Sequence, residues 1–334
     1  MVRRPTSLTE IVLSDPELEA SIKTGLDAVE ERLREAVRAA DPLVNEAAAH
    51  LLDAGGKRFR PLLVLAAAQF GDPELPAVLE SAVVVELTHL ATLYHDDVMD
   101  EADVRRGAPS ANARWSNSVA ILTGDYLFAR ASDVVADLGP EAVRIQSRTF
   151  SRLVTGQIRE TAGPLPGVDP VEHYLGVLAD KTGSLIATSG RFGAMFSGAS
   201  AEVVKTLTTY GETIGVAFQV SDDLLDIDAD PDESGKTPGT DLREGVPTLP
   251  VLYALQSSDP AEARLRSLIS RPLTEDDEVA EAIELLRKSP AMDAARQTLR
   301  TYADRSLSLV SSLPEGPAKT TLQSLAEVVV GRTG

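Results

Sequence analysis

The chain has 334 residues, of which 43% are hydrophobic and 25% charged, as in ordinary globular proteins with a sizeable core. Its 51 acidic and 32 basic residues give a formal net charge of −19, which excludes general affinity for nucleic acids or anionic lipid surfaces. The absence of cysteine excludes disulfides, zinc–thiolate sites and cysteine nucleophiles.

The N-terminal segment has no apolar stretch of the length found in signal peptides. The longest apolar runs, such as PLLVLAAA (61–68), are shorter than a membrane span. We therefore expect a cytoplasmic protein with no targeting segment and no membrane span.

Apolar residues recur at three- and four-residue spacing almost throughout the chain, which predicts helices. We expect an all-α fold in one domain over residues 1–334, because no alternating strand, hairpin signal, solenoid repeat or linker is found. The predicted helices span 14–40, a segment from Asp41-Pro42 to Gly55-Gly56, 61–70, 76–103, 118–137, 140–163, 170–196, 201–229, 246–257, 260–271, 275–288, 290–312 and 317–330. The longest irregular stretch is 229–245, and loops of that length are often functional.

An acidic cluster occupies the segment HDDVMDEADVRRG (95–107), near the end of the predicted 76–103 helix. Asp96 and Asp100 are four residues apart and so share one helix face, with Asp97 beside them. Unpaired carboxylates at a helix C-terminus are unfavourable by roughly 0.3–1 kcal/mol each, and like charges at this spacing add to the cost. A bound hard cation would reverse both effects.

The same arrangement recurs in FQVSDDLLDI (218–227), where Asp222, Asp223 and Asp226 end another apolar helix. A single cluster is equally well explained as a solvated helix end, but two copies favour a metal site. Carboxylates that leave coordination positions open suit Mg²⁺, which keeps several waters and takes further ligands from phosphate. We expect the two clusters to face each other and to hold Mg²⁺ around a diphosphate.

Two other motifs begin in this region, and both fail. DIDADPDESGKT (226–237) starts like an EF-hand calcium loop, but Pro231 and Thr237 stand where Gly and Glu are required. DPDESGKT (230–237) approaches a phosphate-binding P-loop, but Asp230 replaces the first glycine and no strand precedes it.

Basic residues accompany the acidic clusters. GGKRFRP (55–61) places Lys57, Arg58 and Arg60 on a loop whose glycines allow close backbone approach, and an arginine fork can grip phosphate oxygens. Further cations are Arg105, Arg106, Lys181 and Lys236. Each basic turn alone could be a solvated one, but in so acidic a chain their grouping predicts a diphosphate site.

The sequence contains no Ser-His-Asp arrangement, no HExxH motif and no isolated pair of glycosidase-like carboxylates. His89 and His95 flank the start of the first cluster, where a helical histidine is usually only a satisfied polar residue. The chemistry indicated is electrophilic: a diphosphate ionises while metal and cations stabilise the leaving group.

In order along the chain, GGKRFRP, HDDVMDEADVRRG, DKTGS, FQVSDDLLDI and GKTPGTDL resemble the trans-polyprenyl diphosphate synthases. The resemblance extends from about residue 10 to 330. It implies the isoprenoid synthase fold, a single large helical bundle around a deep central cavity, and usually a homodimer.

The resemblance also implies roles for individual residues. The implied Mg²⁺ ligands are Asp96, Asp100 and Asp222, supported by Asp97 and Asp226, with Asp223 in the same catalytic group. The implied isopentenyl diphosphate site consists of Lys57, Arg60, His89 and Arg106. The implied allylic diphosphate site consists of Arg105, Lys181, Thr182, Gln219 and Lys236.

The implied mechanism is ionisation, condensation and elimination. Mg²⁺ and cations draw diphosphate off the allylic substrate, the double bond of isopentenyl diphosphate attacks the allyl cation, and a proton is lost. One position departs from the family, which commonly has Lys where Val246 follows Gly245 here. A phosphate-side cation is therefore missing. Either Lys236 or Arg243 compensates for it, or the allylic diphosphate is bound more weakly.

Product length in this family depends on side chains before the first aspartate cluster. Ala91 and Thr92, and Thr88 one turn earlier, are small where short-chain enzymes tend to carry a bulky aromatic residue. We therefore expect a long-chain product, such as a quinone side chain. The alternative is that another helix closes the cavity, through Phe150, Phe192 or Phe196.

Other functions are less well supported by the sequence. A short-chain farnesyl or geranylgeranyl synthase would share the motifs. A terpene cyclase would need an aromatic-lined pocket, and this chain has 4% aromatic residues. A regulatory subunit of a two-component synthase generally loses the aspartate clusters, and an acidic Ca²⁺-binding module is weakened by the failed EF-hand.

Overall fold

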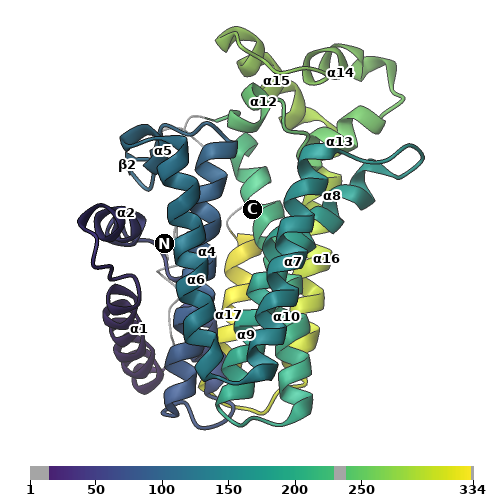
Figure 1. Ribbon diagram of the computed structural model, residues 1–334. Coiled ribbons are helices and arrows are strands. Elements are labelled where there is room, and N and C mark those ends of the chain that lie inside the picture. Colours follow the sequence, from purple (N-terminus) through teal and green to yellow (C-terminus); the bar gives the residue numbers. More distant parts are fainter. Residues whose placement is uncertain (1–14, 229–237, 332–334) are drawn as a thin grey trace.

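The computed structural model describes residues 15–228 and 238–331, which are almost entirely helical (Figure 1). The longer helices are α1 (Pro16–Ala36), α2 (Pro42–Asp53), α3 (Phe59–Ala68), α4 (Pro76–Met99), α6 (Asn117–Asp137), α7 (Pro140–Ala162), α8 (Pro170–Leu178), α9 (Ser184–Phe196), α10 (Ala201–Asp228), α13 (Leu249–Gln256), α15 (Asp276–Lys288), α16 (Pro290–Ser311) and α17 (Pro317–Gly331). Shorter elements are β1 (Val104–Arg105), β2 (Ala108–Pro109), α5 (Ala111–Arg114), the π-helical turn η2 (Ala179–Gly183), α12 (Thr240–Glu244), the 3-10 turn η3 (Pro260–Glu262) and α14 (Ala263–Ile269). The all-α prediction is confirmed.

Local sequence fixes where several helices begin. Asp15 caps α1 and Asp41 caps α2, each accepting a hydrogen bond from a backbone N–H of the first turn. A proline follows each of these aspartates at the first helical position, where its missing N–H is not needed.

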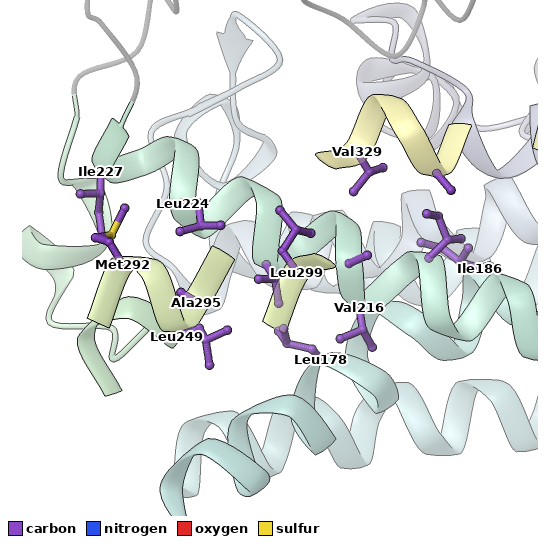
Figure 2. Packing of buried hydrophobic residues seen from close by; sticks show 14 of the residues in the cluster. Leu178, Ile186, Val216, Leu224, Ile227, Leu249, Met292, Ala295, Leu299 and Val329 are labelled. Carbon is purple, nitrogen blue, oxygen red and sulfur yellow. The ribbon is translucent and has the colours of Figure 1, made fainter. Parts of the chain in front are cut away.

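One part of the core is built around α10. Figure 2 shows Leu224 and Ile227 of this helix packed with Met292 and Leu299 of α16, with Val329 of α17 farther along. Burial of each such side chain contributes roughly 1.5–3 kcal/mol. The helix that carries the second aspartate cluster is therefore held rigidly by the core.

A second part of the core surrounds α4, which packs against α1, α3, α6 and α9. Helix α4 is long and apolar enough to cross a membrane, but 72% of its most apolar window is buried inside the protein. It is the central helix of this half of the bundle.

The long helices run side by side, and α12, α14 and α15 lie together beyond one end of them, at the top of Figure 1. Helices α4 and α10 both finish toward this end. The two aspartate clusters, which occupy the last turns of these helices, are thereby brought to the same end of the bundle.

The structure corrects the prediction that the chain contains no strand or hairpin. Strands β1 and β2 pair antiparallel, with Val104 opposite Pro109, across a two-residue turn at Arg106 and Gly107. Both turn residues have positive φ, 55° and 77°, as a tight hairpin requires. The usual Asn-Gly signal is absent because arginine stands at the first turn position.

Other features also differ from prediction. Helix α4 ends at Met99, so that Asp100 follows it as the C-cap residue rather than lying inside a helix to 103. The predicted helix 170–196 is interrupted by η2, and the short helices α5 and α12 were not predicted.

Candidate active site

A cavity of about 470 Å³ lies where the end of α4 meets the loop before α3, together with α7, η2 and α10. Its lining includes many of the residues predicted from the sequence: Lys57, Arg60, His89, Thr92, Asp96, Arg106, Lys181, Thr182 and Gln219. Apolar residues complete the wall, among them Leu153, Leu185, Ile186 and Phe218. The fold thus gathers cations and two carboxylates, those of Asp96 and Glu86, from distant segments around a space with an apolar part.

Lys57 lies on the loop before α3, whereas Arg60, predicted on the same loop, lies in the first turn of α3. The loop is shaped by its glycines. Gly55 and Gly56 have positive φ, and a Cβ at Gly56 would lie 2.8 Å from the guanidinium carbon of Arg106. Arg106 in turn donates hydrogen bonds to the backbone carbonyls of Leu51, at 3.1 Å, and Gly55. Only glycine at position 56 lets Arg106 reach across the loop into the cavity.

Arg60 and His89 are half-buried residues of the cavity wall. The Nε of Arg60 is buried and has no hydrogen-bond partner among the described residues. Burial lowers the pKa of Arg60 to about 10, with Arg106 adding to the effect, so that it stays charged at neutral pH. Burial and then the neighbouring arginines lower the pKa of His89 well below its usual value, and its imidazole is neutral. An unsatisfied buried donor indicates a site that is completed by an anion.

The three carboxylates of the first cluster have different surroundings. Asp96 lines the cavity, and burial raises its pKa to about 6 although Lys181 opposes the shift. Asp97 is fully buried and accepts a hydrogen bond from Arg105. Asp100 is exposed, and its carboxylate lies 3.8 Å from the Arg105 guanidinium. Arg105 therefore lies against these carboxylates and does not line the cavity.

The π-helical turn η2 presents Lys181 and Thr182 to the cavity. Arg152 and Arg159 of α7 bind the two carboxylate oxygens of Asp180, each at 3.0 Å, and so fix the turn from outside. The Lys181 amine lies 2.5 Å from the carboxylate of Glu160. Single π turns inside helices are frequent at functional sites.

Close approach of α7 to η2 depends on Gly156. A Cβ at this position would lie 2.5 Å from the backbone nitrogen of Lys181, and that atom belongs to the turn itself. A side chain at position 156 would therefore displace the lysine that faces the cavity.

The second aspartate cluster is held mainly by protein groups. Asp223 is buried and accepts a hydrogen bond from the hydroxyl of Tyr174; burial raises its pKa to about 8. The carboxylate of Asp226 accepts N–H bonds from Thr240 and Asp241, both at 3.2 Å, and so ties the start of α12 to the end of α10. Asp222 is half-buried, one turn before Asp226.

These carboxylates suit a divalent cation that takes few protein ligands. In the part of the chain that the structure describes, no three acidic or histidine side chains are grouped closely enough to form a ready-made metal site. The buried Oδ2 of Asp97 has no hydrogen-bond partner there either. An all-oxygen donor set with open positions fits Mg²⁺ bound jointly with phosphate oxygens.

The two cations that could compensate for Val246 are Lys236 and Arg243. Lys236 lies outside the described residues. Arg243, the second residue that could compensate for Val246, is bound instead to Asp276 at 2.7 Å. Val246 itself is partly exposed, and its backbone N–H is bonded to Asp241.

Of the three residues predicted to set chain length, one lines the cavity and two do not. Thr92 lines the cavity, whereas Ala91 is buried with its carbonyl oxygen only 3.0 Å from where a Cβ at Gly124 of α6 would lie. Thr88, one turn farther from the aspartates, accepts a hydrogen bond from Gln146 of α7 at 3.4 Å. Thr149 and Thr188 are hydrogen-bonded at 2.6 Å on the neighbouring turns of α7 and α9. Small polar side chains therefore lie one helical turn from cavity-lining residues of α4, α7 and α9.

The aromatic residues considered as an alternative floor lie elsewhere than on the cavity wall. Phe150 stacks on Phe128 of α6 with ring centroids 4.0 Å apart. Phe192 and Phe196 pack edge to face, and Phe192 is fully buried.

Sequence reasoning missed several residues that line the cavity: Glu86, Leu153, Gln157, Leu185, Ile186 and Phe218. Their helices were predicted, but the face each helix turns toward the cavity depends on tertiary packing. Glu86 offered one signal, since a charged residue in the middle of an apolar helix is unusual unless it is paired.

Comparison with known proteins gives a consistent result. Residues 41–286 match the sequence model of the polyprenyl synthetase family. Over 330 residues the chain is 52% identical to the nonaprenyl diphosphate synthase of Mycobacterium tuberculosis, covering 98% of each chain. Its fold is similar to that of a geranylgeranyl pyrophosphate synthase from Corynebacterium glutamicum, which was solved with calcium and isoprenyl diphosphate. The two chains are 47% identical and superpose with a TM-score of 0.87, over 96% of this chain and 98% of that one. A decaprenyl diphosphate synthase from Rhodobacter capsulatus gives the same TM-score at 34% identity, over 95% and 99% of the two chains.

Proposed function

The chain belongs to the polyprenyl synthetase family, and on that basis we propose that it condenses isopentenyl diphosphate with an allylic prenyl diphosphate to make a long-chain, all-trans polyprenyl diphosphate. The reaction is a head-to-tail prenyl transfer. The observation that carries the proposal is the single cavity in which Lys57, Arg60, Arg106 and Lys181 meet Asp96 beside an apolar wall. One end of that space suits diphosphate and the other suits a hydrocarbon chain.

We propose Mg²⁺ as the cofactor, held by Asp96, Asp100 and Asp222. Asp97, Asp223 and Asp226 would keep these ligands in place, because each is already bound to a protein group. When bound, Mg²⁺ would stabilise the negative charge of the departing diphosphate.

The cations of the cavity divide between the two substrates. Lys57, Arg60 and Arg106 would hold isopentenyl diphosphate, with the neutral imidazole of His89 donating one hydrogen bond. Lys181, Thr182 and Gln219 would hold the allylic diphosphate, joined by Arg105 and Lys236. The allylic carbon–oxygen bond breaks, the isopentenyl double bond attacks the allylic carbon, and a proton passes to the released diphosphate. No protein nucleophile is required.

A long product is supported by the small residues below the cavity. Thr92 lines the cavity and Thr88 lies one turn farther along α4, both small where a bulky side chain would block a growing chain. The nonaprenyl synthase is also the most identical of the relatives described above. The geranylgeranyl synthase structure, at 47% identity, supports the alternative of a shorter product. A chain of many isoprene units is typical of quinone side chains, which we propose as its use.

We further propose a cytoplasmic homodimer with one catalytic domain per chain. Helices α6 and α7 expose large apolar side chains, including Leu122 at 65% and Ile158 at 62% exposure. A second copy of the chain covering this face would remove them from water.

The test is incubation of the purified protein with isopentenyl diphosphate, farnesyl or geranylgeranyl diphosphate, and Mg²⁺, followed by chromatography of the dephosphorylated products. We expect elongation well beyond geranylgeranyl. Folded protein that elongates neither primer would contradict the prenyltransferase assignment, and a product that stops at geranylgeranyl would support the short-chain alternative.

A further inference from the structure

Arg58 is the N-cap residue of α3, between the loop residue Lys57 and the helical residue Arg60, and its side chain is bound to several other parts of the protein. It is 7% exposed and has φ of 46°, a left-handed conformation that is uncommon for any residue but glycine. Its guanidinium donates hydrogen bonds to the carbonyl of Leu52 at 3.1 Å and, more weakly, to that of Gly55 at 3.4 Å. Such strained backbone persists only where surrounding contacts hold it.

Two carboxylates from different helices enclose the same guanidinium. Arg58 Nε donates to Glu30 of α1, and Arg58 Nη1 donates to Glu86 of α4 at 3.0 Å. The side chains of Arg58 and Glu86 are 6% and 2% exposed, and that of Glu30 is 26% exposed. Glu30, Arg58 and Glu86 thus form an ion chain that runs from the surface of α1 to the wall of the cavity.

This ion chain adjoins the residues that would bind isopentenyl diphosphate. Lys57 and Arg60 lie on either side of Arg58 in sequence, and all three line the cavity. Arg58 is bound to Glu30 and Glu86, whereas the Arg60 Nε has no hydrogen-bond partner among the described residues. Arg106 donates to the same Gly55 carbonyl as Arg58. The direction in which these three cations point is therefore set by how the loop is held.

We propose that Arg58, gripped between Glu30 and Glu86, is a positioning residue that aims Lys57, Arg60 and Arg106 at one diphosphate. The proposal rests on the proposed function of that site. It gives the N-terminal helix α1 a role in substrate affinity, although Glu30 does not line the cavity. Without the bonds from Arg58 to Glu30 and Glu86, the loop would sample other conformations. Ordering the loop would then reduce the free energy of diphosphate binding.

The decisive variant is Glu30→Gln, which weakens the grip from outside the cavity and preserves side-chain shape. We expect the KM for isopentenyl diphosphate to rise about tenfold, which corresponds to about 1.4 kcal/mol, with kcat and the KM for the allylic substrate nearly unchanged. Arg58→Met should raise the same KM further, and Arg58→Lys should restore part of the loss because charge returns without the fork.

The protein offers a matched control in Arg32→Gln. Arg32 of α1 binds Glu80 of α4 with Nε and Oε1 2.8 Å apart, so that it joins the same two helices away from the cavity. An equal rise of the isopentenyl diphosphate KM in this variant would show that α1 docking in general is responsible, and would overturn the proposal. So would equal changes in both substrate KM values in Glu30→Gln.

Calorimetric titration of isopentenyl diphosphate into the same variants separates this proposal from the proposed function. If the wild type elongates no primer, the prenyltransferase assignment fails, while a selective loss of binding in Glu30→Gln still supports the positioning role. Wild-type binding in Glu30→Gln, with the protein folded by circular dichroism, would overturn it.

Discussion

The side chain of Arg105 donates a hydrogen bond to Asp97, whose carboxylate is completely buried just before the end of α4. The other oxygen of Asp97 is also buried and lacks a partner among the described residues. A buried charge of this kind is stable only with its counter-ion. Arg105 therefore stabilises the aspartate cluster, in addition to the substrate contact proposed for it.

Replacing Arg105 by Gln should lower the free energy of unfolding by about 1–3 kcal/mol, because the Asp97 charge is left uncompensated. Urea unfolding measures this loss. The double variant with Asp97→Asn should lose less than the sum of the two single variants. Strict additivity would contradict the pairing of Arg105 with Asp97. The control is Arg144→Gln, which breaks only an exposed pair with Glu141; its free energy of unfolding should stay within about 0.5 kcal/mol of that of the wild type.

Asp96→Asn should reduce turnover by about 10²-fold or more while the protein stays folded, because the carboxylate that faces the cavity no longer holds a cation beside the diphosphate. Steady-state elongation assays with radiolabelled isopentenyl diphosphate measure the loss. Asp133→Asn, which removes an exposed charge on α6, serves as the control. Turnover equal to that control would refute the metal-binding role of Asp96, as would full activity of the wild type in excess chelator.

Gly156→Ala should raise the KM for the allylic substrate and lower kcat, because the new methyl group would displace the backbone of Lys181. Initial rates at saturating isopentenyl diphosphate measure both. Gly331→Ala is the comparison, since a Cβ there meets nothing within 4 Å. Unchanged kinetics in Gly156→Ala would mean that η2 tolerates a shift of Lys181.

Thr92→Phe should shorten the product, because Thr92 lines the cavity and the ring would close the space below the aspartates. Ala91→Phe, which the sequence also suggested, should chiefly destabilise the protein, by about 1–3 kcal/mol, since Ala91 is buried against α6. Product chromatography with thermal unfolding separates the effects. A stable Ala91→Phe protein with a shorter product would restore the original interpretation.

Much of the fold followed from helical periodicity, because long amphipathic and apolar segments have few alternatives in a globular chain. What periodicity could not supply was the π turn η2, against which Gly156 of α7 and Gly215 of α10 pack closely. The hairpin after α4 was hidden because Arg106 stands at a turn position where Asn is the usual signal. Both features are set by contacts between distant segments.

The candidate site was predictable to the extent that charge is conspicuous in an acidic chain. Lys57, Asp96 and Lys181 were found by residue type and order, and all three line the cavity. Their neighbours were harder to distinguish, since Arg58 and Arg105 look like ligand-binding cations in sequence but are bound to protein carboxylates. Sequence identifies which charges are unusual, and only the fold shows which of them are already neutralised.

Along α4, the positions proposed for metal binding and for product length follow one another without overlap: Asp96 and Thr92 line the cavity one turn apart, and Thr88 lies one turn farther. A substitution at either threonine should alter the room for hydrocarbon and leave the charged residues of the cavity in place. Such separation would let product size change without any change in the proposed metal and phosphate ligands. It also makes this helix the natural starting point for engineering polyprenyl chains of chosen length.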